Sequence, residues 1–418
     1  MPGTIEAVWK AESPRFIAAL CRVTRDVDIA EELAQDALLA ALERWPADGI
    51  PPNPAAWLMT VAKRRAIDDL RRARRLVEKR EAIAGGLEEE QRRLEAEMDR
   101  ALDEVIPDDV LRLVFTACHP VLTPEGRVAL TLRLVGGLTT AEIARAFLLP
   151  EKTVGQRIFR AKRTLAEARV PFETPRGEEL ARRVQSVLAV VYLIFNEGYT
   201  ASAGNEWMRA PLSDEALRLG RMVVELLPAE PEAHALLALM ELNAARTRAR
   251  QGPDGAAILL PDQDRSLWDE GGTERGMAAL AAAQRLGGGA GYYALQAAIA
   301  ACHMRARTAD ATDWERIVLL YDALLQVAPS PVVELNRAVA VGMAAGPAAG
   351  LAALDAMAAH GADARLAQYH LLHSVRGDLL ARLGRPAEAR AEIEQAIALT
   401  RNLRERELLG ERLRRLES

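Results

Sequence analysis

Helical periodicity dominates the sequence and limits the folds that the chain can adopt. Alanine, leucine, glutamate and arginine recur at the spacing of amphipathic helices, whereas aromatic residues make up only 4% of the chain and strand-like alternation hardly occurs. We therefore predict an all-α fold. With 418 residues, the chain is long enough for two or three domains.

Charge and cysteine usage restrict the classes of function. The formal net charge of -5 argues against a chain that coats nucleic acid everywhere, so DNA contacts should be confined to local basic faces. Three widely separated cysteines, Cys21, Cys118 and Cys302, suit a reducing compartment. The longest apolar run, residues 187–195, is too short to span a bilayer, and the N-terminus lacks a signal-peptide pattern. We expect a cytoplasmic protein without a membrane anchor.

Residues 138–165, LTTAEIARAFLLPEKTVGQRIFRAKRTL, predict two short helices joined by a turn. Thr139 and Glu142 have capping-box spacing, so the first helix should begin there. The residues that it should bury are Ile143, Ala144 and Phe147. The second helix should bury one apolar side: Val154, Ile158, Ala161 and Leu165. Its opposite side carries donors, which suits the recognition helix of a helix-turn-helix, although an ordinary hairpin with a solvated basic face has the same pattern.

A second basic stretch lies at residues 53–75, NPAAWLMTVAKRRAIDDLRRARR. One side is apolar: Leu58, Met59, Ala62, Ala66, Leu70 and Ala73. The other side is mostly charged: Trp57, Arg64, Asp68, Arg71 and Arg75. Guanidinium groups beside an indole can hold a phosphate backbone and stack on unpaired bases. Trp57 could equally be a core residue that anchors the start of the helix.

Residues 26–45 predict an amphipathic helix with an acidic outer side. Its inward residues should be Ala30, Leu33, Ala37, Ala41 and Leu42. Its outward residues should be Glu31, Glu32, Gln35, Asp36, Leu39 and Glu43. Such a face is either solvated or a docking surface for a basic partner.

The order of these pieces resembles an extracytoplasmic-function (ECF) sigma factor of bacterial RNA polymerase. The resemblance covers residues 1–172 and rests on AEELAQDALLAALERWP, NPAAWLMTVAKRRAIDDLRR and the helix-turn-helix phrase. It implies that core polymerase binds Asp28, Glu31, Glu32, Gln35 and Asp36. It implies that the minus-ten promoter element contacts Trp57, Lys63, Arg64, Arg65, Asp68, Arg71 and Arg72. It implies that the minus-thirty-five element contacts Thr153, Gln156, Arg157, Arg160, Lys162 and Arg163.

Departures from the family pattern limit the prediction of the promoter sequence. Arg64 stands where many of these factors carry an asparagine near the flipped minus-ten base. Leu148 replaces the customary glycine of the turn, and Lys152 and Gly155 replace the usual glycine and basic residue before Arg157.

The rest of the chain resembles the C-terminal extension of a subgroup of these factors, with tetratricopeptide-like helical hairpins. Gly377, Ala389 and Ala396 have the spacing of small residues in one such repeat, although His373 and Leu380 are among the departures from its pattern. The expected domains are residues 1–80 (sigma region 2), 81–105 (a charged linker), 106–172 (sigma region 4) and 173–418 (the extension).

Enzyme chemistry has no convincing motif in this sequence, and we expect no cofactor or metal. The pairs at 118–119 and 302–303 lack zinc-ligand spacing, and Asp262, Asp264 and Glu274 suit a turn network better than a calcium loop. We therefore predict a sigma factor with core RNA polymerase and promoter DNA as partners, and with a regulatory protein as a candidate partner of the extension. The alternatives are a helix-turn-helix regulator that acts without polymerase and a pure interaction protein.

Overall fold

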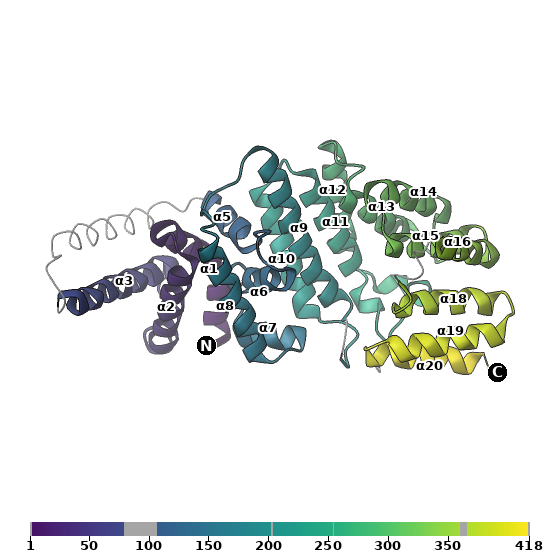
Figure 1. Cartoon of the computed structure of the whole chain (residues 1–418), viewed down its shortest axis with the longest axis horizontal. Helices are drawn as coiled ribbons and strands as arrows, with labels where there is room; N and C mark the ends of the chain where they lie inside the picture. The colour runs from purple at the N-terminus through teal and green to yellow at the C-terminus, as the bar shows by residue number, and fades with distance from the viewer. Residues whose placement is uncertain (1, 79–106, 202–203, 254, 360–365, 417–418) are drawn as a thin grey trace. The chain divides into compact units, whose positions relative to one another are not determined.

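The computed structural model describes residues 2–78, 107–201, 204–253, 255–359 and 366–416. These residues form helices, and the extended pairing among them is limited to two isolated bridges (Figure 1). The prediction of an all-α fold is confirmed. The chain divides into two compact units, residues 1–193 and 194–418.

Three helices form the first module of the N-terminal unit: α1 (Pro2–Thr24), α2 (Val27–Asp48) and α3 (Pro54–Glu78). Each of them packs on the other two. Asp26 caps α2, because its carboxylate accepts hydrogen bonds from the backbone N–H groups of Asp28 at 2.7 Å and Ile29 at 3.1 Å. α2 continues through Pro46, so it ends three residues later than the sequence predicts.

Most of the predicted inward residues of this module are buried. In α2 they are Ala30, Leu33, Ala37 and Ala41, and in α3 they are Leu58, Met59, Ala62 and Ala66. Leu42 was predicted to be buried, but it is 45% exposed. Trp45 takes the apolar role at this end of α2 and is 2% exposed. The side chains of Leu70 and Ala73, and the whole predicted linker 81–105, lie outside the described residues.

Four helices form the second module: α5 (Pro107–Ala117), α6 (Pro124–Leu134), α7 (Thr140–Phe147) and α8 (Glu151–Glu167). Thr139 and Glu142 form the predicted capping box at the start of α7. Ile143 and Ala144 are buried, while Phe147 is only half-buried. All four residues that α8 was predicted to bury are buried: Val154, Ile158, Ala161 and Leu165.

The next helix, α9 (Gly177–Tyr199), contributes its residues up to Leu193 to the same compact unit. Arg183 Nη2 donates to the carbonyl oxygen of Phe115 at 2.7 Å, at the end of α5. Ser186 Oγ donates to the carbonyl oxygen of Cys118 at 2.6 Å and accepts from Arg127 Nη1 at 2.7 Å. These contacts satisfy orphan carbonyl groups at the C-terminal end of α5, so the first half of α9 is part of the core around the second module.

The C-terminal unit is a succession of helices in which neighbours in sequence pack on one another. They are α10 (Ala210–Leu226), α11 (Pro231–Ala244), α12 (Glu270–Arg285), α13 (Tyr292–Arg305), α14 (Trp314–Val327), α15 (Pro331–Ala344), α16 (Pro347–Ala359), α18 (His370–Arg382), α19 (Pro386–Leu399) and α20 (Leu403–Arg415). Gly377 allows α18 to approach α19, because a Cβ there would lie 2.9 Å from Ile393 Cγ1. Ala389 and Ala396 are fully buried. This packing agrees with a helical-hairpin array, and its tetratricopeptide-like character stays a prediction.

Replacing Ser186 tests the attachment of α9 to the second module. Ser186→Ala should lower the free energy of unfolding by about 1–3 kcal/mol, because it leaves a buried carbonyl and a guanidinium donor without their partner. Gln185→Ala, at an exposed position of the same helix, is the matched control. Urea denaturation followed by circular dichroism measures both variants, and equal stability of the two would contradict the assigned role.

Candidate nucleic-acid interface

The turn between α7 and α8 gives the second module the geometry of a helix-turn-helix. α7 ends at Leu148, which has φ 50° and ψ 44° and therefore occupies the left-handed region that glycine usually fills. The backbone N–H of Leu149 donates to the carbonyl of Ala144 at 2.9 Å, which closes the turn. α8 then begins at Glu151 with its apolar side against α6 and α7.

The outer side of α8 presents most of the residues predicted to contact DNA. Gln156, Arg160 and Arg163 are exposed, and Thr153 and Arg157 are half-buried. Arg163 Nε donates to Glu167 Oε1 at 2.7 Å within the helix. Arg157 and Arg160 also line a hollow of about 270 Å³ beside the N-terminus of α6. This surface offers guanidinium groups, which bind phosphate, and the carboxylate of Glu125 lines the hollow beside them.

Phe159 is part of the same surface and was missed in the sequence analysis. Its side chain is 60% exposed, three residues after Gln156 and four before Arg163. Helical spacing therefore places all three side chains on one side, and the same spacing could have identified it. An exposed aromatic ring among donors can make apolar contact with a thymine methyl group.

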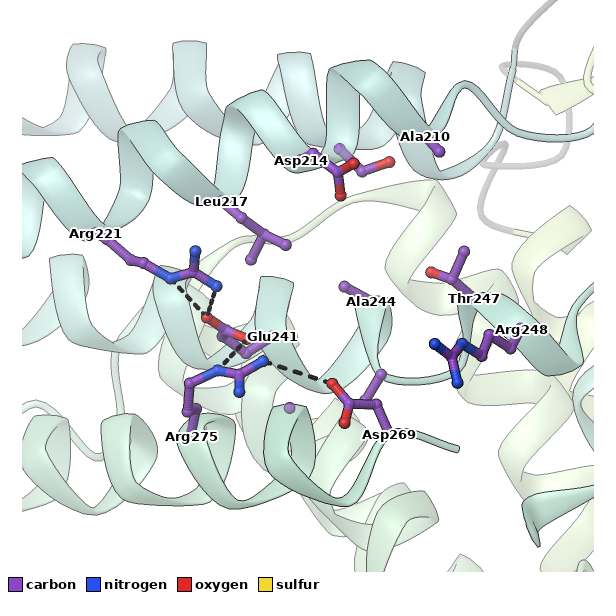
Figure 2. A pocket seen from close by; sticks show the side chains of 13 residues that line it. Ala210, Asp214, Leu217, Arg221, Glu241, Ala244, Thr247, Arg248, Asp269 and Arg275 are labelled. Carbon is purple, nitrogen blue, oxygen red and sulfur yellow. Dashed lines mark hydrogen bonds and ion pairs between the residues drawn. The ribbon is translucent and has the colours of Figure 1, made fainter. Parts of the chain in front are cut away.

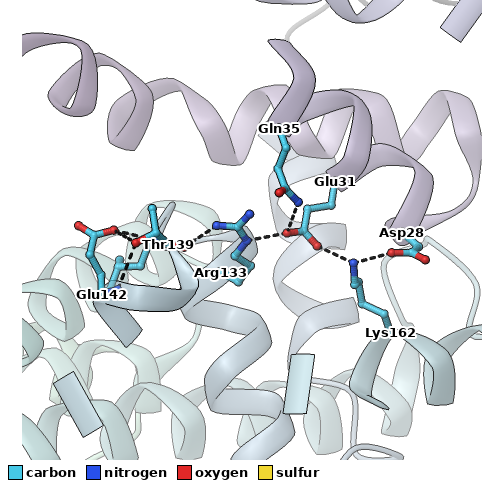
Figure 3. Close-up of polar contacts among 8 residues, drawn as sticks. Asp28, Glu31, Gln35, Arg133, Thr139, Glu142 and Lys162 are labelled. Atoms are coloured by element: carbon cyan, nitrogen blue, oxygen red, sulfur yellow. Dashed lines mark hydrogen bonds and ion pairs between the residues drawn. The ribbon is translucent and has the colours of Figure 1, made fainter. Parts of the chain in front are cut away.

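Lys162 differs from the other predicted DNA contacts, because its side chain is directed at α2 (Figure 3). Its ammonium group pairs with the carboxylates of Asp28 and Glu31, and only 15% of the side chain is exposed. Burial alone would lower the pKa of Lys162, but the two carboxylates outweigh it and raise the pKa. Lys162 is therefore charged, and its ammonium group is already paired with carboxylates of α2.

Glu31 is the buried centre of this cluster. Its side chain is 4% exposed, although the sequence predicted an outward position. Its Oε1 accepts from Arg133 Nε at 2.5 Å and from Gln35 Nε2 at 2.9 Å, while its Oε2 lies 2.8 Å from Lys162 Nζ (Figure 3). The prediction of an outward Glu31 is wrong, because α6 and α8 supply cations that cover it.

The other predicted polymerase contacts on α2 are more accessible. Glu32 and Gln35 are exposed, and Asp28 is 66% exposed despite its pairing with Lys162. Asp36 is half-buried and lies 3.5 Å from Arg65 Nε of α3. Some acidic residues of α2 thus form ion pairs within the chain, while others are exposed to solvent.

The predicted minus-ten contacts lie along α3. Trp57 is half-buried and packs edge-on against Trp45, with ring centroids 5.3 Å apart, so it helps to anchor the start of the helix. Arg64, Arg65 and Asp68 are exposed, and Lys63 is half-buried. The side chains of Arg71 and Arg72 lie outside the described residues.

The C-terminal unit contains a separate charged cavity of about 690 Å³ (Figure 2). Glu241 is 3% exposed at its base and accepts from Arg221 Nη2 at 2.6 Å and from Arg275 Nε at 3.2 Å. Asp214, Asp269 and Arg248 complete the charged lining. Desolvation by burial raises the pKa of Asp214 despite the nearby Arg221. Three acidic and three basic groups balance here, so the cavity suits polar ligands of mixed charge better than simple anions.

Two kinds of feature, a cluster of metal-ligating side chains and a helix that could cross a membrane, are absent from the described residues. No group of three or more His, Cys, Asp or Glu side chains converges there in a way that could hold a metal ion. Asp264 instead accepts from the backbone N–H and the hydroxyl of Ser266, at 2.9 and 2.7 Å, as a turn network does. Among the described helices, none has the length and apolar character needed to cross a membrane.

Family models match three parts of the chain. Sigma-70 region 2 matches residues 8–76, and Sigma-70 region 4 matches residues 112–165. A family of unknown function, DUF6596, matches residues 183–284. The first two matches coincide with the three-helix module and the helix-turn-helix module. Together, the fold and these matches define a sigma factor of the sigma-70 class, a family of transcription initiation factors.

Two individual relatives show to which group of sigma-70 factors the chain is similar. The ECF RNA polymerase sigma factor SigK of Mycobacterium ulcerans (strain Agy99) is 33% identical over 159 residues, which are 36% of this chain and 78% of that protein. The probable ECF RNA polymerase sigma factor SigI of Mycobacterium tuberculosis (strain CDC 1551 / Oshkosh) is 28% identical over 166 residues, 40% of this chain and 56% of that protein. This chain belongs to the ECF RNA polymerase sigma factors.

The C-terminal part also has a relative. The uncharacterized protein R00370 of Rhizobium meliloti (strain 1021) is 44% identical over 404 residues, 96% of this chain and 93% of that protein. Similarity therefore extends over both compact units, which supports the resemblance to a subgroup with a long extension.

Leu148 provides a test of the turn. Leu148→Gly should stabilise the protein by roughly 1 kcal/mol, because glycine removes the steric cost of a left-handed residue at the end of α7. Its side chain is 58% exposed, so little packing is lost. Leu148→Ala removes the same apolar side chain but keeps the Cβ, and it should have little effect. Thermal denaturation compares the two; a Gly variant no more stable than the Ala variant would contradict the argument.

Proposed function

We propose that this sigma factor binds core RNA polymerase and directs initiation at promoters that its own modules recognise. The observation that carries the proposal is the pairing of two family-matched modules, one with an acidic helix and one with a basic recognition helix. In the proposal, the polymerase supplies the contacts to promoter DNA that these two modules do not make. Such a protein acts where core polymerase and DNA are, in the cytoplasm.

In this proposal each surface has its own partner. The residues of α2 that contact polymerase are Asp28, Glu31, Glu32, Gln35 and Asp36. The face of α3 that follows Trp57 opens and binds the minus-ten element, where unpaired bases stack and phosphates need positive charge. The outer side of α8 binds the minus-thirty-five element in the major groove. The C-terminal unit is a tetratricopeptide-like scaffold that binds a regulatory partner or supports the two modules.

Reconstituted transcription separates this proposal from its alternatives. Purified protein and core polymerase should start transcripts from members of a randomised promoter library, and neither component should do so alone. A helix-turn-helix regulator would bind duplex DNA without polymerase and start no transcripts. A pure interaction protein would bind neither.

The acidic face of α2 gives the first prediction for this function. Glu32→Lys combined with Asp36→Lys should weaken binding to core polymerase by roughly tenfold, since exposed charges set steering and complementarity at an interface. Glu43→Lys, on the exposed end of the same helix, is the control. Fluorescence anisotropy with labelled protein measures the affinity, and an unchanged affinity of the double variant would remove α2 from the docking surface.

The recognition helix α8 gives the second prediction for this function. Arg157→Ala or Arg160→Ala should each cost about 1–3 kcal/mol of promoter binding if the side chain contacts a base, and should relax sequence preference at one upstream position. A residue that contacts only phosphate should instead weaken binding evenly and flatten its salt dependence. Arg182→Ala, an exposed arginine of α9, is the control. Normal initiation by the double alanine variant would refute the role of α8.

A further inference from the structure

Cations of the same chain already contact the acidic face of α2. Glu31 lies against Arg133 at the end of α6 and Lys162 of α8, and Asp28 pairs with the same lysine. We propose that this contact, which we call the α2 latch, competes with core polymerase for the face of α2 and holds the sigma factor inactive until it opens. The proposal rests on the proposed function, because it concerns the surface there assigned to polymerase.

The latch is built from groups that are costly to separate one at a time. Glu31 has 4% of its side chain exposed, Lys162 has 15% and Arg133 has 16%. A buried carboxylate is stable only while its partners remain, because an isolated charge in such a place has lost its hydration. The three groups should therefore separate together. The contact then has two states, one with all three groups paired and one with all three apart.

A second ion pair joins the same two modules, with the modules that supply the carboxylate and the cation exchanged. Asp109 of α5 is 3% exposed and lies 3.2 Å from Arg22 Nε of α1. Here the second module supplies the buried carboxylate, which also pairs with Arg112 of the same helix at 3.0 Å, and the first module supplies the cation Arg22. α1 packs on α5 and α6 around this pair. Two reciprocal ion pairs fix one relative placement of the modules, which a non-specific hydrophobic contact would not do.

The consequence for partners follows from geometry. Glu31 cannot reach another protein while α6 and α8 cover it, and Lys162 cannot reach DNA while it pairs with α2. One contact thus withdraws a residue from each of the two predicted functional surfaces. Because only the open fraction binds polymerase, the apparent dissociation constant equals the intrinsic one divided by that fraction. Weakening the latch should therefore tighten binding to polymerase.

Arg133 is the residue to change, since it contributes to the latch and to no surface assigned to polymerase or promoter. Arg133→Gln should tighten binding to core polymerase by about fivefold or more, measured without DNA, and Arg133→Lys should restore much of the wild-type affinity. Lys162→Gln should act in the same direction from the neighbouring helix. Arg145→Gln removes an exposed arginine of α7 and should leave the affinity unchanged.

Opening is measured directly by energy transfer between dyes on the two modules. Cysteines introduced at the exposed positions Ala47 and Ala166 take the dyes, because the native cysteines are buried. Arg133→Gln should lower the transfer efficiency of the free protein, and core polymerase should lower it in the wild type. Circular dichroism confirms that each variant is folded.

The outcomes distinguish the latch from the function on which it rests. Tighter polymerase binding by both Gln variants together with lower energy transfer supports the latch. Equal affinity of wild type and folded variants overturns the latch alone. If neither the wild type nor the opened variants bind polymerase, the proposed function fails and the competition fails with it.

Discussion

The buried carboxylate of Glu31 is the constraint on which the arrangement of the N-terminal unit depends. An ionised carboxylate that loses its water is stable only beside charged or hydrogen-bonding partners. In this chain those partners, Arg133 and Lys162, come from helices more than a hundred residues away. The charge of one residue in the first module therefore helps to determine where the second module lies.

The second module is held from both sides by the same chemistry. At the start of α5, Asp109 pairs with Arg22 of the first module. At its end, the carbonyl groups of Phe115 and Cys118 accept hydrogen bonds from Arg183 and Ser186 of α9. α5 thus connects the first module to the beginning of the C-terminal extension through polar groups that are individually costly to expose. A change in how α9 packs on the end of α5 would therefore act on the helix that carries the Asp109–Arg22 pair.

Sequence periodicity predicted what depends on local geometry and missed what depends on distant partners. The buried side of α8 and the capping box of α7 follow from spacing along one helix, and both are confirmed. Glu31 was assigned to an outward face, because a helical pattern separates polar from apolar residues but does not tell which polar residue another element covers. Lys162 was assigned to DNA by the family resemblance, which likewise does not show that the residue pairs with α2. The prediction also fails at Leu42, which is exposed, whereas Trp45 three residues later is buried. The charged cavity around Glu241 depends on three helices and left no pattern in any of them.

An ECF sigma factor with these two modules carries an internal competitor by its nature. In the proposed function the acidic face of α2 binds polymerase and the basic outer side of α8 binds DNA, and opposite charges on one chain attract each other. Two surfaces on the same chain meet without the loss of freedom that an intermolecular contact costs. Even a weak mutual contact would then dominate unless polymerase and promoter bind both surfaces at once. The buried position of Glu31 suggests that this chain has strengthened the contact rather than avoided it, so that initiation depends on partners able to replace both halves of the latch together.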